Sequence, residues 1–180
     1  LWRAADLADE RADDLAQIIC REGGKPIRFA RAEAKRVSEI FRFAAEEARR
    51  LGGEIVPMDV VPGGECRMGL AFRVPLGVVA AISPFNAPLN LSVQKIAPAI
   101  AAGCTVVLKP SKATPMTALA IGQLLSDAGA PPGACNVVTG GRDSVKALVT
   151  HPDVSVVSFT GSSAVGEQIR SVASYKKVLL

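Results

Sequence analysis

The sequence predicts an α/β protein built on a doubly wound parallel sheet, and three observations point to this fold. From residue 77 onward, short apolar runs alternate with longer amphipathic segments, as in sheets whose strands are joined by helices. The runs are apolar at consecutive positions, which is typical of strands covered on both faces. Each connection is long enough for a right-handed crossover. The expected strands span residues 78–82, 105–108, 136–139 and 154–159, and the expected helices span residues 89–102, 115–128, 143–150 and 163–173.

Two further segments precede this α/β part. Apolar residues recur three and four positions apart over residues 1–20 and 29–51, which predicts an antiparallel pair of helices. The sequence Gly23-Gly24-Lys25-Pro26 between them supplies a helix stop and a turn. Residues 54–76 then combine β-branched residues with two proline turns, which predicts a hairpin or two edge strands. We therefore divide the chain into a helical segment (1–53), a strand pair (54–76) and an α/β domain (77–180).

Composition excludes several classes of function. The 180 residues are 49% hydrophobic, enough to bury one sizeable core. The net charge of +4 is spread along the chain and aromatic residues make up only 4%, so we expect no nucleic-acid partner. No apolar stretch reaches the ~18 residues of a membrane span, and no signal peptide is recognisable. We expect a cytoplasmic protein with no membrane partner.

The cysteines and the histidine give no sign of a metal site. Cys20, Cys66, Cys104 and Cys135 are far apart in the sequence, and none forms a Cys-x-x-Cys pair. His151 is the only histidine. Zinc sites and disulfide frameworks need closer or more regular spacing, so we expect neither.

The loop after the first expected strand is a candidate site, because ligands of open parallel sheets bind beyond the carboxyl ends of the strands. This loop reads Ser83-Pro84-Phe85-Asn86-Ala87-Pro88. Its two prolines restrict the backbone and place Asn86 near the start of the next helix. Asparagine is among the best N-cap residues, so helix capping and a role at a ligand are both open for Asn86.

The loops after the second and third expected strands carry weaker signals. Lys109-Pro110-Ser111-Lys112 places an ammonium at a strand end, where a ribose hydroxyl or a phosphate can accept hydrogen bonds from it. Thr139-Gly140-Gly141-Arg142 is a turn that a ring or phosphate can approach without meeting a Cβ atom. An exposed lysine is more often solubilising and a glycine pair more often only a turn, so neither loop alone defines a site.

The loop after the fourth expected strand carries the strongest single signal. Phe159-Thr160-Gly161-Ser162 leads into a helix that continues through Val165 and Gly166. Glycine and hydroxyl residues at a helix start allow backbone N–H groups and the helix dipole to receive a pyrophosphate. Neither Gly-x-Gly-x-x-Gly nor a P-loop is present. We therefore expect a nucleotide site that binds its ligand by another arrangement.

Taken in order, these motifs resemble the first half of the coenzyme domain of the aldehyde dehydrogenase superfamily, over about residues 7–180. The matching motifs are Pro84-Phe85-Asn86-Ala87-Pro88, Lys109-Pro110-Ser111 and the run from Phe159 to Gly166. The resemblance implies NAD(P)⁺-dependent oxidation of a small-molecule aldehyde to a carboxylic acid through a cysteine thiohemiacetal and thioester. It also implies a homo-oligomer assembled through strands within residues 54–74.

The resemblance also assigns roles to individual residues. Asn86 matches the amide that donates a hydrogen bond to the oxyanion. Lys109 matches the residue that bonds the adenine-side ribose, and Val165 the residue beside the adenine. Gly161 and Ser162 match the pyrophosphate turn. The full expected coenzyme-binding set is Ser83, Pro84, Phe85, Lys109, Ser111, Lys112, Gly140, Phe159, Gly161, Ser162 and Val165.

Lys112 departs from the family pattern, which often has glutamate three residues after the lysine that Lys109 matches. A carboxylate there repels a 2′-phosphate, whereas an ammonium attracts one. Coenzyme choice between NAD and NADP therefore stays open, with the charge of Lys112 favouring tolerance of NADP⁺.

The end of the chain bears on catalysis. In the family, a run like Lys177-Val178-Leu179-Leu180 precedes a Glu-Leu-Gly motif with the general base, and the nucleophilic cysteine comes later. The chain ends before both positions. We therefore expect part of a larger enzyme, with a truncated dinucleotide-binding domain at 77–180 and no activity of its own. Two alternatives remain: a naturally short nucleotide-binding or interaction module without catalysis, and a CoA-acylating or phosphorylating relative.

Overall fold

The computed structural model describes residues 1–180 and begins with a layer of three helices, α1 (Trp2–Glu10), α2 (Ala12–Gly23) and α3 (Ile27–Arg50). The prediction of one helix over residues 1–20 was wrong, because the backbone leaves the helical conformation at Arg11 (φ −100°, ψ 13°). The predicted turn after α2 is present, and Gly24 ends that helix in the left-handed conformation (φ 65°). Buried alanines on α1 allow it to lie close along α3.

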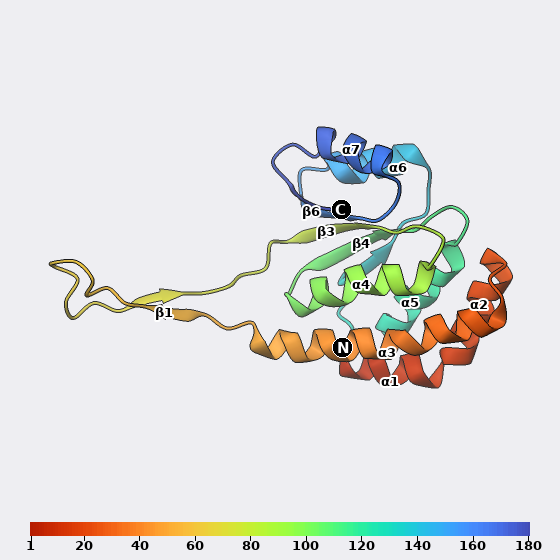
Figure 1. Ribbon diagram of the computed structural model, residues 1–180, viewed down its shortest axis with the longest axis horizontal. Helices are drawn as coiled ribbons and strands as arrows, with labels where there is room; N and C mark the ends of the chain where they lie inside the picture. The colour runs from red at the N-terminus through yellow and green to blue at the C-terminus, as the bar shows by residue number, and fades with distance from the viewer.

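A parallel five-stranded sheet follows, in the order β5-β4-β3-β6-β7. Its strands are β3 (Val78–Ile82), β4 (Thr105–Lys109), β5 (Cys135–Val137), β6 (Val154–Phe159) and β7 (Lys177–Leu179). The helices α4 (Pro88–Ala101) and α5 (Pro115–Asp127) cover one face together with the N-terminal layer, and α6 (Arg142–Thr150) and α7 (Ser163–Val172) cover the other (Figure 1). The predicted doubly wound α/β fold is confirmed.

Two strand boundaries differ from the prediction. The strand expected at 136–139 lies at Cys135–Val137, because these three residues pair with Val106–Leu108 of β4. β4 continues one residue further than expected, so Lys109 is the last residue of the strand and pairs with Ile82. The backbone of Lys109 therefore belongs to the sheet, and only 7% of the residue is exposed.

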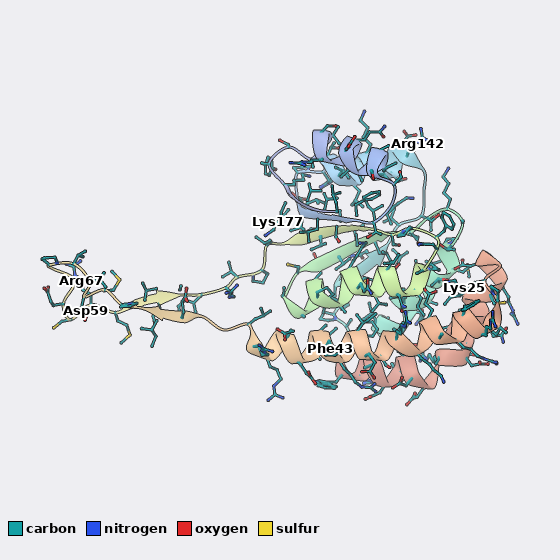
Figure 2. All side chains as sticks on the ribbon, in the orientation of Figure 1. Lys25, Phe43, Asp59, Arg67, Arg142 and Lys177 are labelled. Carbon is teal, nitrogen blue, oxygen red and sulfur yellow. The ribbon has the colours of Figure 1, made fainter.

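A two-stranded antiparallel ribbon projects from the body of the molecule (Figure 1). It consists of β1 (Glu54–Val56) and β2 (Gly69–Ala71), which confirms the predicted hairpin. Figure 2 shows no other segment beside its far end, around Asp59 and Arg67. Large apolar side chains on and beside the ribbon are therefore open to solvent, including Ile55 (74% exposed) and Phe72 (75%).

No helix in the structure combines the length and the apolar composition that a bilayer crossing needs.

Candidate functional site

The strand order places a switch point between β3 and β6. The chain winds from β3 to β4 and β5 on one side, and then returns to β6 and β7 on the other. The loops that leave β3 and β6 therefore diverge, and such divergence creates the crevice where doubly wound sheets bind ligands. Backbone hydrogen bonds fix the bases of these loops: Thr160 N–H donates to Ile82 (3.1 Å) and Ser83 N–H donates to Lys109 (3.2 Å). The predicted loops after β3, β4 and β6 thus meet at one sheet edge.

Lys95, which the sequence analysis did not identify, connects the two sides of the switch point. It lies on α4, and its Nζ donates to Thr160 Oγ1 (2.7 Å), with Ser158 Oγ at 3.4 Å. Burial lowers the pKa of the Lys95 ammonium. A single lysine among the apolar residues of α4 was the available signal, but only the fold shows that it reaches the loop after β6.

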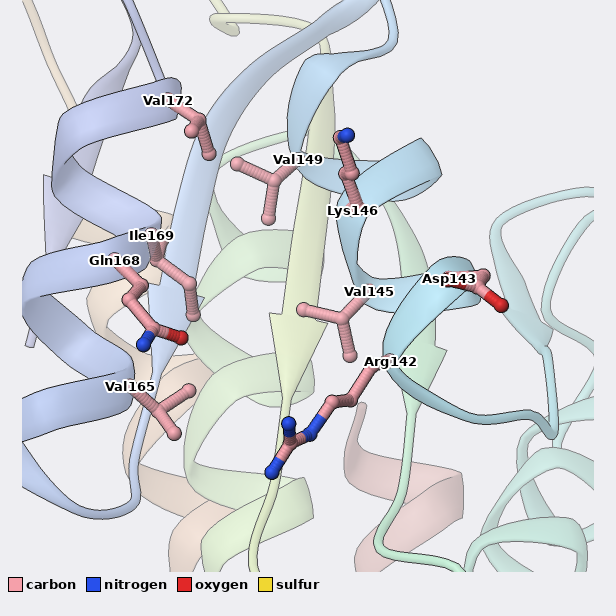
Figure 3. Close-up of a pocket in the computed structure, with 9 residues that line it drawn as sticks. All are labelled: Arg142, Asp143, Val145, Lys146, Val149, Val165, Gln168, Ile169 and Val172. Atoms are coloured by element: carbon pink, nitrogen blue, oxygen red, sulfur yellow. The ribbon is translucent and has the colours of Figure 1, made fainter.

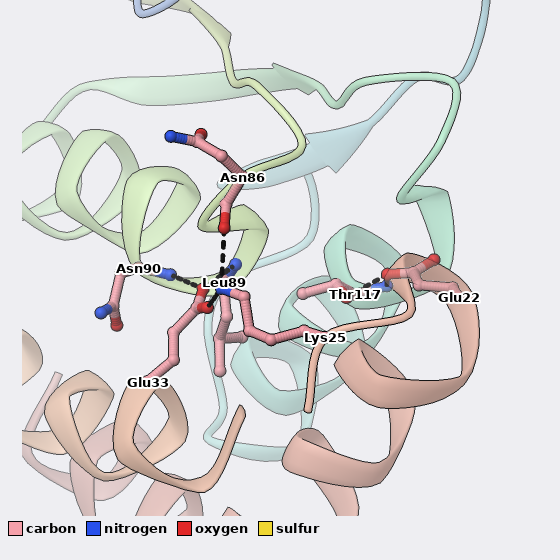
Figure 4. A network of polar contacts seen from close by, with 7 residues as sticks. All are labelled: Glu22, Lys25, Glu33, Asn86, Leu89, Asn90 and Thr117. Carbon is pink, nitrogen blue, oxygen red and sulfur yellow. Dashed lines mark hydrogen bonds and ion pairs between the residues drawn. The ribbon is translucent and has the colours of Figure 1, made fainter. Parts of the chain in front are cut away.

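Asn86 does not cap the helix that follows it, so the capping interpretation was wrong. α4 begins at Pro88 with Ala87 at the N-cap position and no side-chain cap bond. The cap comes instead from Glu33 of α3, whose Oε1 accepts from the N–H groups of Leu89 (2.9 Å) and Asn90 (3.1 Å) (Figure 4). The exposed carboxamide of Asn86 makes no hydrogen bond within the chain and is free to meet a ligand.

The loop after β4 is anchored in a similar way. Its helix, α5, has Thr114 at the N-cap position and no cap bond from that side chain. Glu22 of α2 supplies the cap by accepting from the N–H groups of Met116 and Thr117, both at 2.8 Å, and from the Thr117 hydroxyl (Figure 4). Within the loop, Ser111 Oγ accepts from Ala113 N–H (3.2 Å). The N-terminal helices therefore fix the starts of both helices that lead away from the site.

Three cationic side chains without carboxylate partners gather beside these loops. Lys109 donates to the Pro110 carbonyl (2.8 Å), and its pKa is lowered by burial and by the charge of Lys112. The Lys112 ammonium lies over Gly141, where an added Cβ would stand 3.1 Å from its Nζ. Arg142 follows at the start of α6. None of the three cations takes part in an ion pair, so this part of the surface is suited to an anion.

A cleft of about 290 Å³ opens between α6 and α7, next to Arg142. Its walls are mainly apolar, and Val165 lies at one end of it (Figure 3). The side chains around it are Arg142, Asp143, Val145, Lys146, Val149, Val165, Gln168, Ile169 and Val172. Small-molecule sites combine apolar walls with a few polar groups at the edge, so the cleft has the character needed for a flat heteroaromatic ring.

Several of the residues expected to bind the coenzyme also make packing contacts or hydrogen bonds within the chain. Phe159 is 7% exposed and belongs to the core beneath α6 and α7. Its ring lies against Gly161, where a Cβ would meet Phe159 Cζ at 2.4 Å, so packing alone demands glycine there. Gly140 faces Ser144 in the same manner. Ser83 is buried and accepts a hydrogen bond from the Ser92 hydroxyl (2.9 Å), whereas Pro84 is half-buried, and Phe85 and Ser162 are exposed.

The four cysteines are unpaired thiols. Burial raises the pKa of the Cys135 thiol to about 11, so it stays protonated and unreactive near neutral pH. Cys104 is buried at the start of β4 and Cys66 lies in the exposed ribbon. No cysteine lies at the sheet edge that carries the candidate site, so none is placed to attack a ligand there.

The features gathered at this edge of the sheet define a class of protein. A doubly wound sheet has at its switch point a free carboxamide, an uncapped helix start at Ser163, and a cationic rim beside an apolar cleft. Those are features of a dinucleotide-binding domain. A model of the aldehyde dehydrogenase family matches residues 1–180. The chain belongs to the aldehyde dehydrogenase family.

Individual relatives agree with this assignment. A 3-sulfolactaldehyde dehydrogenase from Priestia aryabhattai is 47% identical over 181 residues, covering 100% of this chain and 38% of the relative. A mitochondrial succinate-semialdehyde dehydrogenase from Arabidopsis thaliana is 44% identical, covering 100% and 34%. The crystal structure of an NADP-dependent glyceraldehyde-3-phosphate dehydrogenase from Bacillus halodurans C-125, complexed with NADP, superposes with a TM-score of 0.92 at 42% identity, covering 98% and 38%. The chain thus spans little more than a third of the length of these relatives.

Proposed function

We propose that the protein containing this chain oxidises an aldehyde to a carboxylic acid with NAD(P)⁺. In this proposal residues 77–180 provide coenzyme binding and one catalytic group, and the nucleophile and base come from elsewhere in the protein. The observation that carries it is the free carboxamide of Asn86 at the switch point, beside the uncapped start of α7. When bound, the coenzyme supplies the hydride acceptor.

Asn86 acts as the hydrogen-bond donor to the oxyanion that develops when the aldehyde carbonyl is attacked. Its side-chain N–H has no competing acceptor within the chain. A donor held in position before the reaction stabilises developing charge without reorganisation, and loss of such a donor typically costs about 10²–10³ in rate. The prolines on either side, Pro84 and Pro88, limit the motion of the loop that carries it.

The coenzyme is proposed to lie along the carboxyl ends of the strands. The first-turn N–H groups of α7, together with Gly161 and Ser162, face the pyrophosphate. Lys109 bonds the adenine-side ribose, and the cleft lined by Val165 takes the adenine. Support comes from the apolar walls of that cleft and from the unpaired cations beside it.

NADP⁺ is proposed as the preferred form of the coenzyme. Arg142 lines the cleft, Lys112 lies against the adjoining Gly141, and neither cation has a carboxylate partner. Guanidinium and ammonium groups bind phosphate through charge-assisted hydrogen bonds. The NADP complex of the Bacillus halodurans relative is consistent with this choice.

The substrate is proposed to be a small aldehyde that carries an anionic group. The relatives described above are named for sulfolactaldehyde, succinate semialdehyde and glyceraldehyde 3-phosphate, and each of these aldehydes is an anion. This inference rests on the relatives rather than on a pocket in the chain.

A homo-oligomer in the cytoplasm completes the proposal. The β1–β2 ribbon exposes Ile55, Leu70 and Phe72 away from the body of the molecule. Exposed apolar strands with free edges pair readily with another chain. Four unpaired cysteines suit a reducing compartment.

The test is an assay of aldehyde-dependent NADPH and NADH formation by the protein that contains this chain. Succinate semialdehyde and a neutral aldehyde of similar length serve as the substrate pair. The proposal predicts activity with the anionic aldehyde, and a fall in kcat of about 10²–10³ in Asn86→Ala. Unchanged kcat in Asn86→Ala would remove Asn86 from the reaction, and no activity with either aldehyde or coenzyme would contradict the proposed chemistry.

A further inference from the structure

The turn between α2 and α3 contacts the Asn86 loop through Lys25, which also pairs with the buried carboxylate of Glu33. We propose that Lys25 and Glu33 are positioning residues, which hold the backbone of Asn86 so that its carboxamide stays aimed at the reacting carbonyl. This inference rests on the proposed function for the reaction itself, but the holding of the loop is a property of the chain alone.

Glu33 is a carboxylate in an unusual place. Only 5% of it is exposed, between α3 and α4. A charged group in such surroundings is stable only when hydrogen bonds and an opposite charge replace its water. Both are present, because Oε1 accepts from Leu89 and Asn90 N–H, and Oε2 pairs with the Lys25 ammonium.

Lys25 extends this pair to the Asn86 loop. Its Nζ donates to the backbone carbonyl of Asn86 at 2.7 Å as well as to Glu33 (Figure 4). The lysine side chain is 23% exposed, so water competes only partly for these bonds. One ammonium therefore joins a buried carboxylate on α3 to the peptide group of the candidate oxyanion donor.

Helix capping alone does not account for this arrangement. The cap of α4 needs only Glu33 Oε1, which reaches the second and third residues of that helix. The Lys25 bond goes to Asn86, which lies before the helix begins at Pro88. In Figure 4 the Asn86 carboxamide points away from Lys25, so the carbonyl is held on one side while the amide is presented on the other. A misplacement of about 1 Å at such a group can cost about 10² in rate.

The test compares Lys25→Met with Lys35→Met, a matched substitution of an exposed lysine on α3 that has no ion-pair partner. The first readout is hydrogen exchange of the Leu89 and Asn90 amides. Without the lysine the buried Glu33 carboxylate loses its counter-charge, and exchange should quicken by about tenfold or more. Lys35→Met should leave it unchanged. Lys25→Arg keeps a cation able to bridge the same two acceptors and should restore slow exchange.

The second readout is a double-mutant cycle on aldehyde oxidation in the protein that contains this chain. Lys25→Met should lower kcat by about 10- to 100-fold while coenzyme affinity stays within about twofold. In an Asn86→Ala background the same change should cost less than about threefold, because the lysine acts through Asn86. A structural defect would lower both backgrounds equally.

The exchange rates and the kcat values together decide whether Lys25 and Glu33 position Asn86. Unchanged amide exchange in Lys25→Met, or equal losses of kcat in the two backgrounds, would overturn the inference. Faster exchange that Lys25→Arg reverses, together with the unequal losses, supports it. If the unmodified protein oxidises no aldehyde, the proposed function fails separately, and the exchange rates alone decide whether Lys25 and Glu33 hold the loop.

Discussion

Replacing Glu22 with alanine should destabilise the chain, because this side chain caps α5 from a distant helix. Glu22 accepts from Met116 N–H, Thr117 N–H and the Thr117 hydroxyl. Thr117 is 1% exposed, so water cannot replace the acceptor that its N–H and its hydroxyl share, and each unpaired buried group costs about 1–3 kcal/mol. Met116 is exposed, and water can satisfy its N–H. For the two Thr117 groups together, the expected loss in the free energy of unfolding is therefore about 2–6 kcal/mol.

The assay is urea unfolding followed by far-ultraviolet circular dichroism at a fixed pH. Glu22→Gln keeps an acceptor oxygen and should lose only about 1 kcal/mol. Glu46→Ala, at an exposed position of α3 without an ion-pair partner, is the control and should change stability by less than about 0.5 kcal/mol. If Glu22→Ala matched this control, the start of α5 would not depend on Glu22, and the reasoning about caps from distant helices would be refuted.

Two further predictions concern single side chains. Lys112→Glu should lower the affinity for NADP⁺ relative to NAD⁺ by about tenfold or more, because a carboxylate repels the 2′-phosphate. Titration with NADP⁺ and with NAD⁺ checks this, and equal changes for the two would contradict it. Cys135, whose pKa burial raises to about 11, should react with iodoacetamide at pH 8.5 far more slowly than the exposed Cys66, and should speed up as the pH rises toward 11. Peptide mass spectrometry measures both labelling rates, and similar rates at pH 8.5 would contradict the burial argument.

The sheet was predictable because its strands are short apolar runs separated by helical segments. Val78–Ile82 and Val154–Phe159 lie where the sequence placed them, since both are interior strands rich in valine and other apolar residues. The strand predicted at 136–139 was displaced, because the pairing with β4 that sets its register is not local in the sequence. The break at Arg11 was missed for a related reason, because the apolar spacing of residues 1–20 continues across it.

The candidate site was only partly predictable. Proline and glycine motifs marked the loops after β3, β4 and β6, and the fold brings these loops to one edge. The sequence left helix capping open as one role of the nearby Asn86, whereas Glu33 supplies the cap of α4 from another helix. Lys95 was missed in the same way, since its partner Thr160 lies 65 residues later. Local patterns identify loops, but the contacts that hold them come from residues distant in the sequence.

A dinucleotide site at the carboxyl edge of the sheet underlies the function proposed for this chain. The most direct measurement is isothermal titration of the 180-residue chain with NADP⁺ and with NAD⁺, repeated for Lys109→Met. We expect saturable binding of one ligand per chain, tighter for NADP⁺ than for NAD⁺, and weaker binding of both coenzymes in Lys109→Met. Absence of saturable binding for both coenzymes, or binding unaffected by Lys109→Met, would contradict the proposed site.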